Sequence, residues 1–332
     1  MPRSRGVVAA VSLALLSALN CSAPAPRTES GVADWPPTPY LVVLGTVQDA
    51  GSPQAACAKT CCADLWLDPD PMRQVSCLGL VDPARGATYL FDATPDLPRQ
   101  LYTLGQHVGD PHGLPAGIFL THAHTGHYTG LIHLGREAIG ADGVPVYAMP
   151  RLDSFLRADG PWSQLVALGN VQLRPLREGV TVALAGDTVD TAAGKALNVT
   201  PLRVPHRDEY SETVGYRIAG PQRTALFIPD IDKWRRWDRD LAAELADADY
   251  ALVDGTFFCG NELPGRDMSA IPHPSVEETM ALLASLPASE RAKVRFIHLN
   301  HTNPLLDPAS AESARVRSAG FAVARYGDVL PL

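Results

Sequence analysis

Short runs of apolar residues recur from residue 40 to the C-terminus and predict many β-strands. The expected strands are 40–47, 76–82, 88–94, 116–122, 144–149, 171–176, 181–186, 199–205, 213–220, 224–230, 250–258, 293–301 and 321–327. Apolar residues at helical spacing predict helices over 96–108, 129–139, 239–248 and 275–286. This alternation of strands and helices predicts a layered α/β fold and excludes a helical bundle.

The first 39 residues follow a different pattern. A basic start, MPRSR, precedes the apolar run GVVAAVSLALLSAL, which is shorter than a membrane span and typical of a signal peptide. The following stretch is rich in Pro, Ser and Ala, the composition of a flexible spacer. We therefore expect a signal peptide over 1–20, a spacer over 21–39 and one domain over 40–332.

Cys21 follows the apolar run and is a candidate for lipid attachment, which would tether an exported protein to the cell envelope. Asn20 departs from the Gly, Ala or Ser that bacterial lipoproteins usually carry before this cysteine. The alternatives are a cleaved, soluble periplasmic form and an uncleaved anchor.

Composition narrows the class of partner. The chain has 332 residues, 46% of them hydrophobic and 19% charged, which is the mix of a globular protein with a sizeable core. Its net charge is −8 and it contains no run of Lys or Arg. A basic face for nucleic acid is therefore not expected, and the expected partner is a small-molecule substrate.

Histidine and aspartate side chains gather at the ends of predicted strands, where a sheet projects side chains into loops. The segment THAHTGHYTG ends one strand and contains three histidines at H-x-H-x-x-H spacing. The candidate metal ligands are His122, His124, His127, His206, Asp230, His298 and His301. Neutral imidazoles together with a carboxylate bind Zn²⁺ or Fe²⁺ and can leave a position open for water.

The order of these residues resembles the metallo-β-lactamase superfamily, and the resemblance covers residues 40–332. LGTVQDAGSPQ, VDGTFF, GRDMSAIPH and HLNHTNPLL are similar to motifs of the branch that contains coenzyme PQQ synthesis protein B. A related member of that branch is the phosphodiesterase accessory to carbon–phosphorus lyase. The resemblance implies an αββα sandwich with one or two metal ions at one edge of its two sheets.

The resemblance also implies a role for each ligand. The residues matching the first metal position are His122, His124 and His206, with Asp230 as the carboxylate that bridges two metals. His127 and His298 match the second position. Asp230 and His298 are the expected catalytic residues, acting beside a metal-bound hydroxide. Asp92 matches an aspartate that supports the histidine loop by hydrogen bonding, and Glu209 and Glu212 are expected to do similar work near His206.

Gly126 departs from the superfamily pattern H-x-H-x-D-H, in which an Asp at this position binds the second metal. Two outcomes follow. Either the second metal is weak or absent, or Asp232 or His301 takes over the missing carboxylate's place.

The segment CAKTCC forms a second candidate site. Related branch members carry a structural zinc on such a loop, so the resemblance implies a zinc site made of Cys57, Cys61 and Cys62 with His273 as fourth ligand. The alternative is a disulfide from Cys57 to Cys61 or Cys62. Setting Cys21 aside leaves an odd number of cysteines, which favours zinc.

Three functions are consistent with these residues. The favoured one is an exported metal-dependent hydrolase that acts on a small ester, lactone or phosphodiester. The second is a mononuclear iron-dependent oxidative enzyme similar to coenzyme PQQ synthesis protein B. The third is a non-catalytic module that binds a metal or ligand. Metal content separates them: two zinc ions per active site favour the first, one iron the second, and no active-site metal the third.

Lipid attachment is tested by Cys21→Ala in the native host. We expect the variant to leave the membrane fraction and to accumulate as a soluble, folded domain, because lipid chains would be its only stable anchor. Membrane fractionation with immunoblotting measures this, and Ser22→Ala is the matched control. Unchanged membrane association of Cys21→Ala would rule out lipidation at this cysteine.

Overall fold

The computed structural model describes residues 35–184 and 197–332, together with the first two residues. The expected signal peptide, Cys21 and most of the spacer lie outside the described residues. Within the described part of the chain, no helix is long and apolar enough to cross a membrane.

Two seven-stranded sheets form the centre of the unit that spans Pro36–Leu332. The first sheet has the order β14 (Val329–Pro331), β1 (Tyr40–Gly45), β2 (Cys77–Asp82), β3 (Ala87–Phe91), β4 (Gly117–Phe119), β5 (Val144–Ala148) and β6 (Val171–Pro175). The second has the order β13 (Ala322–Val323), β12 (Val294–Ile297), β11 (Tyr250–Asp254), β10 (Thr224–Ile228), β9 (Val214–Ala219), β8 (Asn198–Arg203) and β7 (Val182–Ala183).

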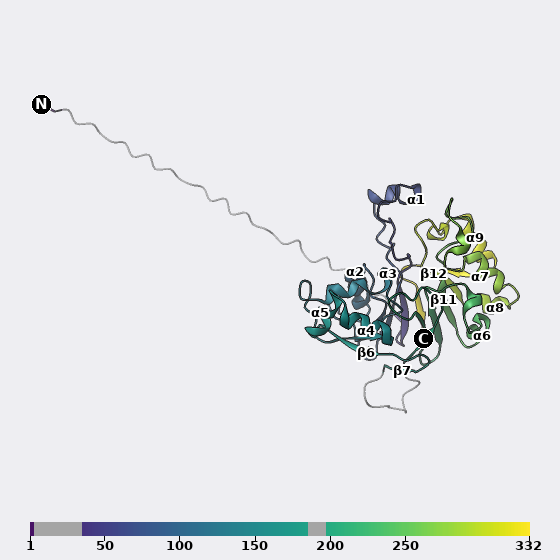
Figure 1. Cartoon of the computed structure of the whole chain (residues 1–332), viewed down its shortest axis with the longest axis horizontal. Helices are drawn as coiled ribbons and strands as arrows, with labels where there is room; N and C mark the ends of the chain where they lie inside the picture. Colours follow the sequence, from purple (N-terminus) through teal and green to yellow (C-terminus); the bar gives the residue numbers. More distant parts are fainter. Residues whose placement is uncertain (3–34, 185–196) are drawn as a thin grey trace. The chain divides into compact units, whose positions relative to one another are not determined.

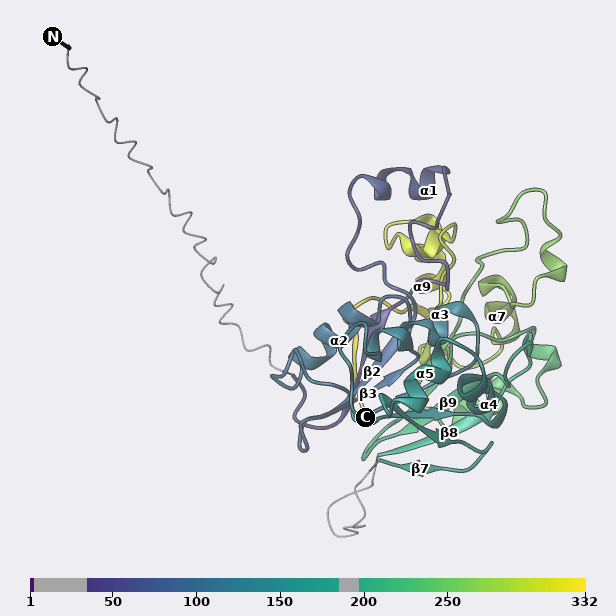
Figure 2. The same ribbon diagram turned by 60° about the vertical axis from the view of Figure 1, so that its left-hand side comes forward.

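Helices cover the outer face of each sheet (Figure 1). Those on the first sheet's side include α2 (Leu97–Gln106), α4 (Pro150–Ala158) and α5 (Trp162–Ala167). Those on the second sheet's side are α6 (Leu241–Ala246), α7 (Val276–Leu282), α8 (Ala288–Arg291) and α9 (Ala311–Ser318). The short α1 (Thr60–Ala63) projects from the sandwich (Figure 2), and α3 (Thr125–Tyr128) contains part of the histidine loop. The predicted αββα sandwich is confirmed.

The alternation of side chains along each strand explains the layers. In β1, Val42 and Leu44 pack against the helices of the first sheet, while Leu41 and Val43 face the second sheet. Successive side chains of a strand point to opposite faces, so a strand with apolar residues at every position is buried on both sides. The continuous apolar runs of the sequence are the consequence of this double burial.

The prediction of a helix over 129–139 is wrong in type. The segment instead begins directly after α3 with a 3-10 helix over Thr129–Leu134, and Gly135 ends that helix in extended backbone. The helices α4 and α5 were not predicted. Both are short, and a proline marks the start of each: Pro150 is the first residue of α4, and Pro161 is the residue directly before α5.

Phe119 tests the packing between the sheets. It is fully buried, stacks on Tyr147 at 4.2 Å between ring centroids and meets Tyr216 of the second sheet edge-on at 5.8 Å. We expect Phe119→Ala to lower the free energy of unfolding by about 3–5 kcal/mol, because it leaves a cavity. Urea denaturation measures this, with the exposed Ile139→Ala as control. A loss below about 1 kcal/mol would contradict tight packing at this position.

Candidate metal centre

The polar residues at strand ends meet at one edge of the sandwich. Strands β3 and β4 are parallel, as are β10, β11 and β12, while β8 and β10 both run antiparallel to β9. Their carboxyl ends therefore lie on the same side. The loops after these strands carry Asp92 (β3), His122 and His124 (β4), His206 (β8), Asp230 (β10) and His298 (β12).

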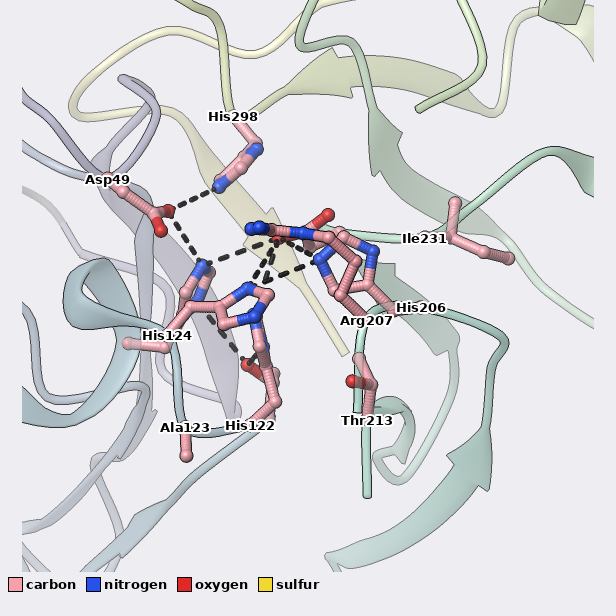
Figure 3. A network of polar contacts seen from close by, with 12 residues as sticks. Asp49, His122, Ala123, His124, His206, Arg207, Thr213, Ile231 and His298 are labelled. Atoms are coloured by element: carbon pink, nitrogen blue, oxygen red, sulfur yellow. Dashed lines mark hydrogen bonds and ion pairs between the residues drawn. The ribbon is translucent and has the colours of Figure 1, made fainter. Parts of the chain in front are cut away.

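The first group of ligands is centred on the carboxylate of Asp230. His122, His124, His206 and Asp230 each offer one ligand atom, and these atoms all lie within 4.8 Å of one another. Asp230 Oδ2 is 3.4 Å from His122 Nε2 and 3.2 Å from His206 Nε2. His124 Nδ1 lies 3.2 Å from His206 Nε2 (Figure 3). The structure thus brings together all four residues expected at the first metal position.

The second group shares Asp230 and adds a residue that was not predicted. Asp49, His127, Asp230 and His298 also offer ligand atoms within 4.8 Å of one another. Asp49 Oδ1 lies 3.0 Å from both His127 Nε2 and His298 Nε2, and Figure 3 shows its contact with His298. His127 and His298 therefore lie together as expected, and a carboxylate does stand beside them.

Neither residue expected to replace the missing carboxylate lies in this group. Asp232 accepts hydrogen bonds from the backbone N–H of Lys233 and from Arg236. His301 lies in a cluster with cysteines. Both expectations were wrong, because the space beside His127 is taken by Asp49 from the loop after β1. The signal that could have found Asp49 is a lone acidic residue in the loop after a predicted strand.

Asp92 supports the histidine loop, as predicted. Its carboxylate accepts hydrogen bonds from the backbone N–H of Thr121 at 2.7 Å and contacts His127 Nδ1 at 2.7 Å. Asp92 has a φ of 72° and His298 a φ of 63°. A left-handed backbone at a residue with a side chain costs about 1–2 kcal/mol, so the surrounding contacts must stabilise this conformation.

The two glutamates near His206 differ in their contacts. Glu209 Oε2 lies 2.9 Å from His124 Nε2, so it orients a histidine of the first group. The carboxylate of Glu212 accepts a hydrogen bond from the backbone N–H of Arg151. The expectation for Glu209 is therefore correct except that it contacts His124, and the expectation for Glu212 is wrong.

Burial and neighbouring charges shift the pKa values of the residues at the centre. Burial alone would raise the pKa of Asp230, but the nearby His206 and His273 hold that pKa well below its ordinary value. Burial would likewise raise the pKa of Asp49, but His127 and His298 hold it well below its ordinary value. Burial lowers the pKa of His122 well below its ordinary value. Burial would lower the pKa of His127, but Asp92 and Asp49 hold it well above its ordinary value, so a metal ion bound there would displace a proton from this imidazole.

One nitrogen atom indicates that a metal fits. His122 is 1% exposed, and its Nε2 has no hydrogen-bond partner within the described residues. A buried polar atom without a partner is costly, and buried polar groups in proteins almost always have one. This atom points into a group of three imidazoles and one carboxylate, a ligand set that suits Zn²⁺ or Fe²⁺.

His273 lies at this centre and not at the cysteines. Its Nδ1 is 2.8 Å from Asp254 Oδ2 and 3.2 Å from Asp230 Oδ1. Burial would lower its pKa, but Asp254 and Asp230 raise it to about 9. The expectation that His273 completes the cysteine site was therefore wrong, because the loop after β11 directs it to the carboxylate of Asp254.

The cysteine cluster uses His301 as its histidine. Cys57, Cys61, Cys62 and His301 offer ligand atoms within 4.8 Å of one another, and the cysteines are free. The sulfur atoms of Cys61 and Cys62 are 4.0 Å apart. Zinc–sulfur bonds of about 2.3 Å in a tetrahedron place two sulfurs about 3.8 Å apart, and Cys57 forms no disulfide with Cys61 or Cys62 in the structure. The geometry therefore matches a zinc–thiolate site.

A cavity of about 610 Å³ lies between the two clusters. We call the two ligand groups that share Asp230 the His/Asp centre. The cavity is lined by His273, which contacts Asp230 of that centre, and by Cys57 and His301 of the cysteine cluster. Its lining also contains the cationic residues Lys59, Arg207 and Arg266, and it contains no carboxylate. Such a cavity is suited to an anionic molecule, in spite of the chain's net charge of −8.

Comparisons with known proteins agree with this architecture. The family described as "Beta-lactamase superfamily domain" matches residues 87–320. Coenzyme PQQ synthesis protein B of Methylorubrum extorquens is 27% identical over 314 residues, covering 88% of this chain and 100% of that protein.

Two solved structures resemble the fold. One is Zn²⁺-bound PqqB from Methylobacterium extorquens, with a TM-score of 0.70 and 24% identity, covering 88% of this chain and 100% of the other. The second is a diphosphatase of the PhnP family, with a TM-score of 0.59 and 20% identity, covering 89% of this chain and 98% of the other.

Proposed function

The chain belongs to the beta-lactamase superfamily, and from this premise we propose that it is a metal-dependent hydrolase of a small ester, lactone or phosphodiester. The observation that carries the proposal is the group His122, His124, His206 and Asp230, in which the buried His122 Nε2 makes no hydrogen bond to the described residues. These four residues would hold the first metal ion. Zinc in such a site acts as a Lewis acid and makes water a nucleophile near neutral pH.

The cavity beside the centre favours an anionic substrate among these three classes. Lys59, Arg207 and Arg266 line it, and His273 joins it to Asp230. A phosphodiester carries its negative charge at the bond to be broken, and cationic side chains stabilise both that charge and the charge that develops in the transition state. A neutral ester or lactone gains less from them. We therefore propose a phosphodiester as the preferred class.

A second candidate function is supported by the relatives. Coenzyme PQQ synthesis protein B is similar to this chain over 100% of its own length. We regard a mononuclear iron enzyme with an oxidative reaction related to PQQ synthesis as the alternative. The His/Asp centre also suits Fe²⁺. A single tightly bound iron at the centre of the natively purified protein, with no hydrolysis of any ester, would favour it.

We also propose that the protein acts outside the cytoplasm as a lipid-anchored enzyme. The basis is the sequence of residues 1–21, which combines a basic start, an apolar run and a cysteine. On this proposal the spacer over 21–39 separates the domain from the membrane.

The hydrolase proposal is tested with the purified full chain loaded with zinc. We expect turnover of bis(p-nitrophenyl) phosphate and a loss of at least about 100-fold in kcat/KM for His122→Ala and His206→Ala, because each removes a metal ligand. Release of p-nitrophenol and metal analysis measure the two effects. His112→Ala is the control, since His112 is exposed and outside the centre.

The proposed preference for an anionic substrate is tested separately from the proposed hydrolysis. Arg266→Ala should raise KM for the phosphodiester while leaving KM for p-nitrophenyl acetate unchanged, and Arg136→Ala, outside the cavity, should change neither. Full metal content in His122→Ala would contradict the ligand assignment. Equal effects of Arg266→Ala on both substrates would contradict the preference for an anion.

We propose further that the cysteine cluster holds a structural zinc ion bound by Cys57, Cys61, Cys62 and His301. The four ligand types and the sulfur separation support it. The site would have no open position, so it would stabilise the projecting α1 segment without taking part in catalysis.

Cys62→Ser and His301→Gln should each reduce tightly bound zinc by one equivalent per chain. Elemental analysis measures this, and Cys259→Ser, outside the cluster, is the control. Thiol titration of the denatured wild type without reductant distinguishes the rival disulfide. Two thiols fewer than the number of cysteines, together with unchanged zinc in both variants, would overturn the proposal.

A further inference from the structure

Asp49 occupies a position between two histidines of the centre. Its Oδ1 is equidistant from His127 Nε2 and His298 Nε2, at 3.0 Å from each. In Figure 3 its carboxylate points toward the imidazole groups and away from the loop that carries it. With Asp230 these residues form a group whose ligand atoms lie within 4.8 Å of one another.

Backbone pairing fixes Asp49 at this place. The N–H of Gln48 donates to the carbonyl of Leu299 at 2.8 Å, and the N–H of Leu299 donates to the carbonyl of Thr46 at 2.7 Å. The loop after β1 is therefore joined to the residue that follows His298, although the two belong to different sheets. The backbone therefore holds Asp49 and His298 close enough for their side chains to meet.

Gly126 leaves the room that Asp49 occupies. A Cβ at position 126 would lie 2.6 Å from both Cα and Oδ1 of Asp49. Side-chain carbons essentially never approach that closely, and one of these atoms belongs to the backbone. Gly126 does not have a positive φ, so conformational freedom is not the reason for glycine here. A side chain at position 126 and Asp49 in its present place exclude each other.

We propose that Asp49 is the carboxylate ligand of a second metal ion, bound together with His127, His298 and the shared Asp230, and that Gly126 is required for it. The carboxylate enters the centre from the loop after β1, whereas the superfamily pattern H-x-H-x-D-H brings it from the histidine loop. This inference rests on the proposed metal-dependent function for the presence of metal, and it is independent of the substrate. It also reverses the expectation that glycine at position 126 weakens the second site.

The same observation overturns a simpler expectation about Gly126→Asp. The H-x-H-x-D-H pattern suggests that this substitution would restore a missing ligand without moving the loop. The 2.6 Å contact with the backbone of Asp49 excludes that outcome. Adding a side chain here displaces a carboxylate that is already present, and the centre gains nothing.

The test measures metal binding by the full chain, stripped with chelator and titrated with Co²⁺. Cobalt at the cysteine cluster gives thiolate charge-transfer absorption, which separates it from cobalt at the His/Asp centre. We expect the wild type to bind two equivalents at the His/Asp centre. Asp49→Asn, nearly the same in shape, should bind the second at least about 100-fold more weakly and keep the first, because it removes a charged ligand.

Gly126→Ala should produce the same loss while leaving Asp49 intact, since its Cβ pushes the loop after β1 away. Asp232→Asn is the matched control: a nearby carboxylate paired with Arg236, expected to keep both equivalents. Retention of the first equivalent and an unchanged circular dichroism spectrum show that a variant is folded.

Two equally tight equivalents in Asp49→Asn, or a single equivalent in both wild type and Asp49→Asn, would overturn the inference. A wild type with two equivalents, an Asp49→Asn variant with one, and no hydrolysis of any ester would refute the proposed reaction and leave the metal assignment standing. The two proposals therefore fail separately.

Discussion

The burial of the Asp230 carboxylate is the constraint on which this centre depends. Asp230 is 3% exposed and lies where the two sheets meet, within 4.0 Å of imidazole nitrogens of His122, His124, His127 and His206. Removing a carboxylate from water costs several kcal/mol unless positive charge or hydrogen bonds offset it. The surrounding histidines can offset it by binding protons or by sharing a metal ion. Asp230 therefore needs positive charge beside it, and a metal ion shared with these imidazoles is one of the two ways to supply that charge.

The sandwich places these groups by strand direction. Strands of both sheets end at one edge, and the loops that follow them carry the polar residues of the centre. The left-handed backbone of Asp92 and His298 shows that the positions of these residues are enforced by their surroundings. Asp92 is held by Thr121, and His298 Nδ1 lies 2.9 Å from Thr256 Oγ1, which in turn donates to Asp254. The first ligands are thus oriented by buried partners, the usual requirement for a metal centre.

The apolar runs predicted a layered α/β fold, and the resemblance to the superfamily implied the sandwich and the first ligand group. Doubly buried strands leave continuous apolar runs, and His122, His124, His206 and Asp230 each directly follow such a run. These are local signals, and the histidine spacing carries the family pattern. Asp49 was missed because its role depends on position 126, 77 residues away along the chain, and on a backbone pairing between loops of different sheets. Only the folded chain brings Gly126 and Asp49 together.

His273 and His301 lie at the opposite sites from those predicted, and this too depends on contacts that form only in the folded chain. Both histidines follow strands of the second sheet, and nothing local distinguishes the one that faces the cysteines from the one that faces the carboxylates. The choice is made by Asp254, which ends β11 and contacts His273 at 2.8 Å. Pairing of a buried carboxylate with the nearest imidazole thus decides which loop serves which cluster.

Two chain segments contribute residues to both clusters. The first segment carries Asp49 to the His/Asp centre and then Cys57, Cys61 and Cys62 to the cysteine cluster. The second carries His298 to the centre and, three residues later, His301 to the cysteines. The two segments are joined between the clusters by the backbone bonds of Leu299 with Thr46 and Gln48. A metal ion in the cysteine cluster would therefore restrict the loop that positions Asp49, although it lies outside the reaction. The cavity with Lys59 lies between the clusters, so the same restriction also fixes a cationic wall of the proposed substrate site. The cysteine cluster and the His/Asp centre are thus coupled, because the same two segments contribute ligands to each and are hydrogen-bonded to one another between them.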